Sequence, residues 1–177
     1  MYRCPYCVSD ELVMLYSQYE SEGFTDLRSK AYLKALTGLY SGNYLLRKSR
    51  ASNPDVADAF VLRTAEVYLN KAEAEAMLDK AEAVETLKVL LKNRFKDGQI
   101  PDITGLSGES LVKFIREERL RELSFECHRW FDLRRYAVCT KYPEKKSITH
   151  EMHALDDFPG QVIKILTLEP YGEDPAW

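Results

Sequence analysis

The chain has 177 residues, of which 45% are hydrophobic and 30% are charged, and its 25 lysines and arginines nearly balance its 28 aspartates and glutamates. This length suits one domain or part of a larger one, and the composition excludes a disordered chain, a collagen-like chain and a small disulfide-rich scaffold. The net charge of −3 is spread without a basic block, so nothing indicates nucleic-acid binding. No apolar run approaches the ~18 residues of a transmembrane helix.

The first predicted helix covers Asp10 to Glu20, and Gly23 is its expected stop. Its apolar residues recur at helical spacing, at Leu12, Leu15, Tyr16 and Tyr19. The next stretch, Asp26 to Asn53, is predicted to be loop-rich, with a short extended piece at Tyr44 to Leu46. The residues that interrupt its pattern are Gly38, Gly42 and Asn43.

Two helices joined by a short turn follow, opened by Asn53 and Pro54. The first, Ala59 to Leu78, carries an apolar face of Val61, Ala65, Tyr68, Leu69, Ala72 and Ala76. The opposite, polar face holds Glu66, Lys71, Glu73 and Glu75. After a break at Asp79 and Lys80, a second apolar stripe, which ends before Gly98, consists of Ala83, Leu87, Leu90, Leu91 and Phe95. The pair is typical of a tetratricopeptide-type hairpin, which cannot bury its apolar face alone.

The C-terminal half predicts two more helices and a tail. A turn-rich loop from Ile100 to Gly108 leads into a third helix, capped by Ser107 or Gly108 and running to Phe125. A fourth helix covers His128 to Val138. The tail, Thr140 to Trp177, is predicted to be irregular with at most a β-hairpin around VIKILTL, Val162 to Leu168. The predicted fold is therefore mainly α, with tetratricopeptide-like helical hairpins, loop-rich flanks and a short C-terminal β-hairpin.

The sharpest signal is the charged run FIREERLRELSFECHRWFDLRR, from Phe114 to Arg135. Glu118, Glu122 and Glu126 recur every fourth residue and continue an apolar stripe, so they should be at least partly buried. A buried carboxylate must be paired or hydrogen-bonded, and arginine forks are close in sequence. The run therefore predicts a structural ion-pair network of Glu118, Arg119, Arg121, Glu122, Glu126, Arg129, Asp132 and Arg135.

Glutamates one helical turn apart also occur in di-iron sites and in glycosidases. A di-iron bundle would want Glu-x-x-His, but Phe125 stands three residues after Glu122, and His128 only two after Glu126. His150 and His153 miss the His-Glu-x-x-His zinc spacing by one residue. The structural network is the favoured interpretation, a metal-dependent hydrolase is a distant one, and no metal or cofactor is predicted.

Four cysteines do not define a compartment. Cys4 and Cys7 form a CPYC motif like that of redox-active sites, yet only three residues precede it, too few for the strand that such a site needs. A loop leading into a helix is favoured. A zinc site that adds Cys127 and Cys139 lacks paired-knuckle spacing, and the redox state of the four thiols stays open.

Two long phrases stand out, VLRTAEVYLNKAEAEAML at Val61 to Leu78 and EERLRELSFECHRWFDLRR at Glu117 to Arg135. They resemble phrases of the SusD/RagB family of outer-membrane nutrient-binding proteins. The first is similar to the family's Arg-x-Ala-Glu-x-Tyr-Leu-x-x-Ala-Glu-Ala phrase. EERLRELSFECHRWFDLRR, Glu117 to Arg135, is similar to its Glu-Arg-x-x-Glu-Leu and Trp-Phe-Asp-Leu-x-Arg run, although Cys127 stands where the family usually has glycine. Because members are much longer, the resemblance implies that residues 1–177 are a single C-terminal domain, with the N-terminal helical repeats and the lipoprotein signal outside it.

The resemblance implies a non-catalytic, cell-surface lipoprotein of the outer membrane that binds glycans and delivers oligosaccharides to a SusC-type TonB-dependent transporter. Sugars bind by stacking on exposed aromatic rings, and Tyr40 and Tyr44, beside loop glycines, are the candidate glycan contacts. Much of a family member's glycan site comes from portions outside this chain. The alternative is a helical-repeat scaffold that binds a protein or peptide partner and has no role with sugars.

Overall fold

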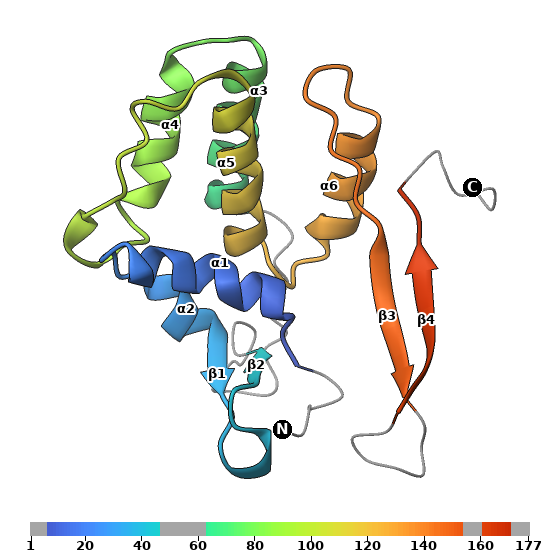
Figure 1. The fold of residues 1–177 in the computed structure, drawn as a ribbon. Helices are drawn as coiled ribbons and strands as arrows, with labels where there is room; N and C mark the ends of the chain where they lie inside the picture. Colours follow the sequence, from blue (N-terminus) through green and yellow to red (C-terminus); the bar gives the residue numbers. More distant parts are fainter. Residues whose placement is uncertain (1–6, 47–62, 154–160, 171–177) are drawn as a thin grey trace.

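The computed structural model describes residues 7–46, 63–153 and 161–170. Within them the chain forms six α-helices and two antiparallel strand pairs (Figure 1). The predicted mainly α fold with a C-terminal β-hairpin is confirmed. None of the helices in these stretches has the length and apolar character needed to cross a bilayer. Whether residues 1–177 form a single domain stays a prediction.

Helices α3 (Thr64–Met77), α4 (Glu82–Leu91) and α5 (Gly108–Glu122) pack around the main core. The first two form the predicted hairpin, and Asp79 in the turn between them has a φ of 54°. Small residues of α3 allow neighbouring helices to approach closely, and burial of each leucine contributes roughly 1.5–3 kcal/mol. The buried core residues include Leu69, Ala72, Ala76, Leu87, Leu91, Val112 and Ile115.

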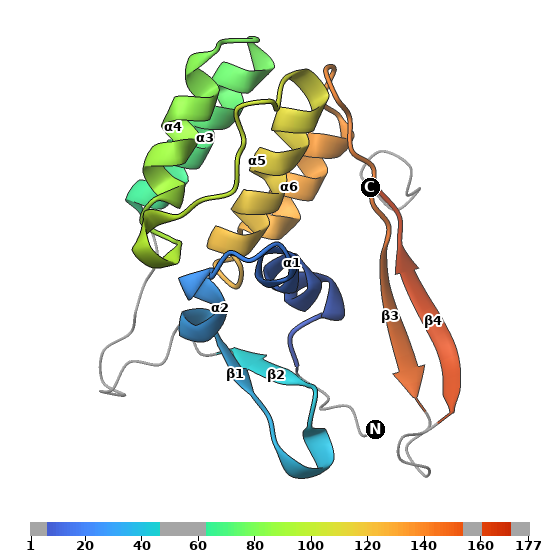
Figure 2. The same cartoon turned by 60° about the vertical axis from the view of Figure 1, so that its left-hand side comes forward.

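Helices α1 (Asp10–Ser21) and α2 (Leu27–Tyr32) cross beneath the ends of this bundle (Figures 1 and 2). The Ser9 hydroxyl caps α1 by accepting from the Leu12 N–H at 3.4 Å. Strand β1 (Leu33–Ala35) pairs with β2 (Tyr44–Leu46) in the first antiparallel ladder. A second, smaller core between α1 and this ladder consists of Val8, Leu12, Tyr16 and Leu33.

Helix α6 (His128–Ala137) lies beside α5, and the chain then forms the hairpin of β3 (Ile148–His153) and β4 (Val162–Leu168). Ile148 lies opposite Leu168 in its register. Both ribbon views place this hairpin to one side of the helical body (Figures 1 and 2). Its exposed apolar side chains are Ile148, Met152, Val162, Ile163, Ile165 and Leu166.

The prediction of a loop-rich stretch from Asp26 onward was wrong for its first part, which forms α2 and β1. A six-residue helix shows no apolar period, and it depends on a cap: the Asp26 carboxylate accepts from the Arg28 N–H at 2.9 Å. The extended piece at Tyr44 to Leu46 is confirmed as β2.

Three predicted helix ends also differ. Helix α3 begins at Thr64, and the predicted start at Ala59, like Asn53 and Pro54, lies outside the described residues. Helix α4 ends at Leu91 because Phe95 turns to an extended backbone that bridges to Asp26, although its ring stays in the core. Helix α5 ends at Glu122, and a short 3₁₀ turn, Lys96–Gly98, follows α4.

Candidate functional site

Glu118 of α5 is fully buried and held on both carboxylate oxygens. Its Oε1 accepts from the Tyr19 hydroxyl at 2.5 Å and from Arg121 Nη1 at 2.8 Å. Its Oε2 lies 2.9 Å from Arg28 Nη1, and Arg28 is itself only 2% exposed. The Arg28 guanidinium also donates to Asp26, with Nη2 2.7 Å from Oδ2. This part of the network is therefore neutralised without access to water.

Glu122, one turn further, collects three guanidinium groups. Arg94 donates to both oxygens, from Nε at 2.7 Å and from Nη2 at 3.0 Å. Arg28 Nη1 lies 3.4 Å away, and Arg63 pairs with both Glu122 and Glu126. We call this group the Glu122 cluster; it comprises Asp26, Arg28, Arg63, Arg94, Glu118, Arg121, Glu122 and Glu126.

A second group, the Glu73 cluster, joins α3, α5 and α6; it comprises Glu73, Arg116, Arg119, Asp132 and Arg135. Arg135 donates to both oxygens of Glu73 at 2.7 Å. Asp132 accepts from Arg119 Nη2 and from Arg135 Nη2, each at 3.0 Å. The predicted place of Glu73 on the polar face of its helix was wrong: the residue is 5% exposed.

The predicted network residues thus divide between two clusters, with one exception. Arg129 of α6 belongs to neither, because its Nη2 lies 4.0 Å from Glu11 of α1. Of the arginines in the charged run, only Arg121 pairs with Glu118, whereas partners of Glu122 and Glu126 come from distant segments. The roles of these residues in stability stay predictions.

Burial alone would raise the pKa of the Glu122 carboxyl, but hydrogen bonds from Arg94 and the charges of Arg28, Arg94 and Arg63 outweigh it and lower that pKa to about 2. Burial also raises the pKa of the Glu118 carboxyl, but the charges of Arg28 and Arg121 outweigh it and hold that pKa below its usual value. Both carboxylates are therefore ionised at neutral pH, which does not suit a general acid.

Within the stretches that the structure describes, no three histidine, cysteine, aspartate or glutamate side chains gather in a group that could hold a metal ion. Glu118 and Glu122 instead face guanidinium groups. His150 lies on the exposed strand β3. These findings describe an ion-pair network between helices.

The two tyrosines predicted to contact glycans lie near each other in sequence but differ in setting. Tyr40 ends the short 3₁₀ helix Gly38–Tyr40, and its side chain is outside the described part of the structure. Tyr44 is half-buried on β2, where it packs against the small core and lines a hollow of about 210 Å³ with Tyr16 and Lys30. Their role in sugar binding stays a prediction.

Three of the four cysteines lie within the described residues. Cys4 lies outside the described residues, while Cys7, Cys127 and Cys139 are free thiols. Cys127 is exposed and has a φ of 63°, a left-handed backbone that favours glycine. The departure from glycine noted in the sequence therefore falls on a residue whose backbone is strained.

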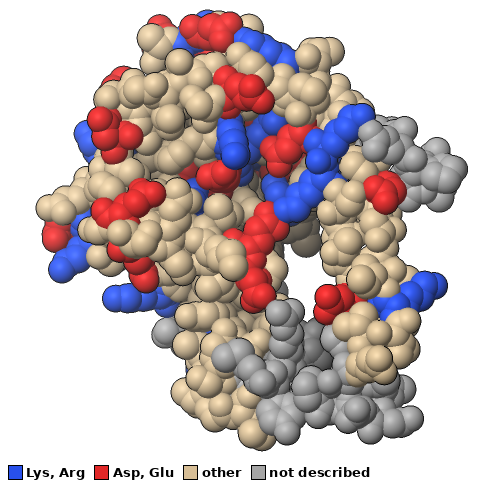
Figure 3. All heavy atoms as spheres, viewed as in Figure 1, with Lys and Arg blue, Asp and Glu red and all other residues tan. Residues whose placement is uncertain are grey.

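A groove of about 330 Å³ runs along α5, bounded by the start of α1, by α6 and by residues 142–144. Its apolar lining is Leu15, Val112, Leu120, Tyr142 and Pro143. Its carboxylates are Glu11, Glu109, Glu117 and Glu144, and its cations are Lys113, Arg116 and Arg129. We call this groove the α5 groove. Acidic and basic side chains lie side by side on this face of the molecule (Figure 3).

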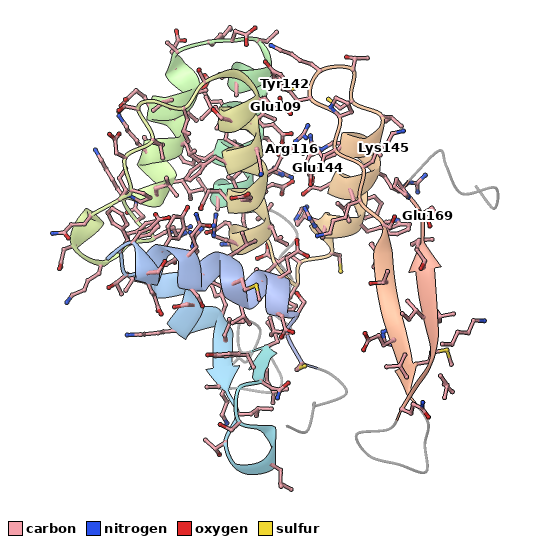
Figure 4. The ribbon with its side chains drawn as sticks, viewed as in Figure 1. Glu109, Arg116, Tyr142, Glu144, Lys145 and Glu169 are labelled. Carbon is pink, nitrogen blue, oxygen red and sulfur yellow. The ribbon has the colours of Figure 1, made fainter. Side chains whose placement is uncertain are left out.

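One wall of the α5 groove is tied to α5 by a buried arginine (Figure 4). Arg116 Nη1 donates to the Tyr142 carbonyl at 2.8 Å and lies 3.4 Å from Glu144 Oε2. Tyr142 has a φ of 57°, and its hydroxyl would lie only 3.1 Å from a Cβ added at Gly108. Arg116 is 5% exposed, so it lines the groove mainly as a buried support for this wall.

Sequence reasoning missed several of these residues. Arg28 and Arg94 carried no local signal, because each stands alone outside the charged run, and Arg63, which opens the Arg-x-Ala-Glu phrase, was not predicted to join the network. Counting charges gave no signal either, because the run from Phe114 to Arg135 holds six arginines against four glutamates and one aspartate. Tyr142 was assigned to an irregular tail, and only the adjoining Pro143 marked a turn.

Comparison with known proteins gives one match. Residues 13–167 match the model of the SusD family, which is more than half of the chain. Neither a search of curated proteins nor a search of solved structures returned a match. The match includes both phrases that carry the resemblance, and it spans the two ion-pair clusters and all of the α5 groove lining except Glu11. The chain therefore belongs to the SusD family.

Proposed function

We propose that this protein is a glycan-binding, non-catalytic subunit at the outer-membrane surface. The observation that carries the proposal is the family match over residues 13–167, because the SusD family is one of nutrient-binding, outer-membrane-associated proteins. Within that role, we propose that it binds oligosaccharides and delivers them to a SusC-type TonB-dependent transporter, and that a lipid anchor holds it at the cell surface.

The ion-pair clusters support a binding role over a catalytic one. The Glu122 carboxyl has a pKa lowered to about 2, and both of its oxygens accept hydrogen bonds from Arg94. A glycosidase needs one carboxyl that is protonated near the working pH. Glu118 and Glu122 are both fully buried, so neither carboxylate lies at a surface where a sugar could bind.

The alternative function, a helical scaffold that binds a protein or peptide, draws on exposed apolar residues of the α3–α4 hairpin. Val67 and Leu78 are 65% and 67% exposed. Exposed apolar surface of this kind is typical of interaction sites once it forms a contiguous patch. The family match favours the glycan role over this alternative.

The test is saturation-transfer NMR on the purified 177-residue chain with a panel of neutral, amino and acidic oligosaccharides, since this method detects weak binding. We expect saturable transfer to at least one class, and no new reducing ends after prolonged incubation. Transfer to none of the sugars would contradict glycan binding, and release of reducing ends would contradict the non-catalytic role. A helical protein of similar net charge serves as the control.

A further inference from the structure

Strand β4 is exposed along almost its whole length, although most of its residues are apolar. Every side chain from 162 to 167 is exposed, so neither face of the strand is buried in the described structure. Val162, Ile163, Ile165 and Leu166 are between 41% and 63% exposed. Contiguous exposed apolar surface of this kind is typical of an interaction site on a soluble protein.

The outer edge of β4 is open as well. Both ribbon views place β4 on the side of the hairpin away from the helices, with β3 nearer to α6 (Figures 1 and 2). Among the described elements, the extensive contacts of each strand are with the other strand of the pair. Alternate residues of β4 therefore direct their backbone N–H and C=O groups away from β3, where a further strand can pair with them.

The two edges of the hairpin differ in charge. Strand β3 carries Glu151 and two histidines, and charged or polar side chains protect an edge strand against pairing with another chain. Strand β4 carries one charge, Lys164, among its seven residues. A two-stranded hairpin is marginally stable in water, whereas a sheet of three or more strands is more stable. These features favour the addition of a strand at β4.

The sequence of β4 fits antiparallel pairing with a second copy of itself. The strand has seven residues, so only the register centred on Ile165 pairs all of them. In that register Ile165 faces the second copy's Ile165, and Lys164 faces Leu166. No like charges lie opposite each other, whereas a register centred on Lys164 would place two lysines opposite each other.

The hairpin is also held in a fixed direction relative to the helices. The Ser147 hydroxyl, just before β3, donates to Glu169 Oε2 at 2.7 Å, just after β4. The neighbouring Lys146 pairs with Glu11 of α1. An edge held in place before association loses less conformational freedom on binding, which favours pairing.

The area available suits a weak dimer. The exposed apolar side chains of the hairpin present roughly 500 Å² in one copy, which is within the range of patches that mark interaction sites. Two copies that cover most of this surface bury up to about 1,000 Å², at the lower limit for a specific interface. We therefore expect a dissociation constant of roughly 10–100 µM.

We propose that two copies of this chain pair through the outer edges of β4, antiparallel and centred on Ile165, to form a four-stranded sheet in the order β3–β4–β4–β3. The arrangement has two-fold symmetry and is closed, because it uses both β4 edges while each β3 edge faces the helices of its own copy. This surface is separate from the ion-pair clusters and from the α5 groove, and the proposal does not depend on glycan binding.

The experiment is sedimentation of the purified 177-residue chain over a hundredfold range of concentration, starting near ~5 µM. We expect the mass to rise with concentration from 20.5 kDa toward twice that value. Ile165→Lys and Ile165→Glu each place like charges opposite each other at the symmetry axis, so each variant should dimerise at least tenfold more weakly than the parent. When the two variants are mixed, opposite charges face each other, and the dimer should return.

Val67→Lys is the matched control, because Val67 is 65% exposed on α3, outside the hairpin, and this variant should dimerise like the parent. Circular dichroism melting checks that the variants, all at exposed positions, remain folded. A chain that stays monomeric over the whole range would overturn the dimer. Dimerisation that survives Ile165→Lys, or that Val67→Lys abolishes, would place the contact elsewhere. Failure of the mixed variants to pair would refute the register, and growth beyond a dimer would refute the closed arrangement.

Discussion

Replacement of Glu122 by glutamine keeps the shape of the side chain and removes its charge. The carboxylate is fully buried and accepts two hydrogen bonds from Arg94, with Arg28 and Arg63 also paired to it. A carboxyl whose pKa falls from 4.5 to about 2 on folding contributes about 3 kcal/mol at neutral pH. We therefore expect Glu122→Gln to lower the free energy of unfolding by about 3 kcal/mol at pH 7.

The sign of the pH dependence follows from the lowered pKa. The contribution is complete above the unfolded value near 4.5 and is lost as the pH falls toward about 2, since the folded carboxylate then becomes protonated. Urea unfolding followed by circular dichroism at pH 7, 5 and 4 measures this, and the difference between parent and variant should shrink at the lowest pH. Glu82→Gln on the surface of α4 is the control. A variant within about 0.5 kcal/mol of the parent at pH 7 would refute the reasoning.

Three further outcomes are expected. Cys127→Gly should raise the free energy of unfolding by about 0.5–1 kcal/mol, because glycine adopts the left-handed backbone at a φ of 63° without strain. Cys127→Val should lower the free energy of unfolding. Urea titrations measure both variants, and equal stability of the two would contradict this prediction. Glu73→Gln should lower the free energy of unfolding by about 2–3 kcal/mol, since it weakens a bidentate pair with Arg135. The control Glu66→Gln on the same helix should change stability little. A thermal-shift comparison of the two variants checks this order of stability. The CPYC segment should be redox-silent; titration of Cys4 with a thiol reagent across pH tests this, and a reaction midpoint near ~7 or below would indicate a redox-active motif.

The sequence predicted the elements that bury long apolar stripes. Leu69, Ala72 and Ala76 recur at helical spacing, and they lie on α3 and are buried in the main core. The alternating run at Val162 to Leu168 forms a strand. The six-residue helix α2 was not predicted, because it depends on the cap at Asp26 and on tertiary contacts. A helix of six residues is too short to show an apolar period.

The site was predictable only in part, for a related reason. Spacing placed Glu118 and Glu122 on a buried face of one helix, and a buried carboxylate requires a cation. Which cation it receives depends on the tertiary fold, and Arg63 and Arg94 are far away in the chain. The charge of Glu73 misled the prediction, since a glutamate on a helix is usually exposed unless it is paired.

The placement of the two clusters bears on how α5 is held in position. Arg28 near the start of α2, Arg63 before α3 and Arg94 after α4 all converge on the last turn of α5. A slip of α5 by one turn would move Glu122 by about 5.4 Å and strand buried charges, whereas leucine contacts alone would tolerate it far better. We therefore expect the inner charges to fix the position and rotation of α5. A fixed rotation would keep Glu109 and Glu117 on the side of the helix that lines the α5 groove.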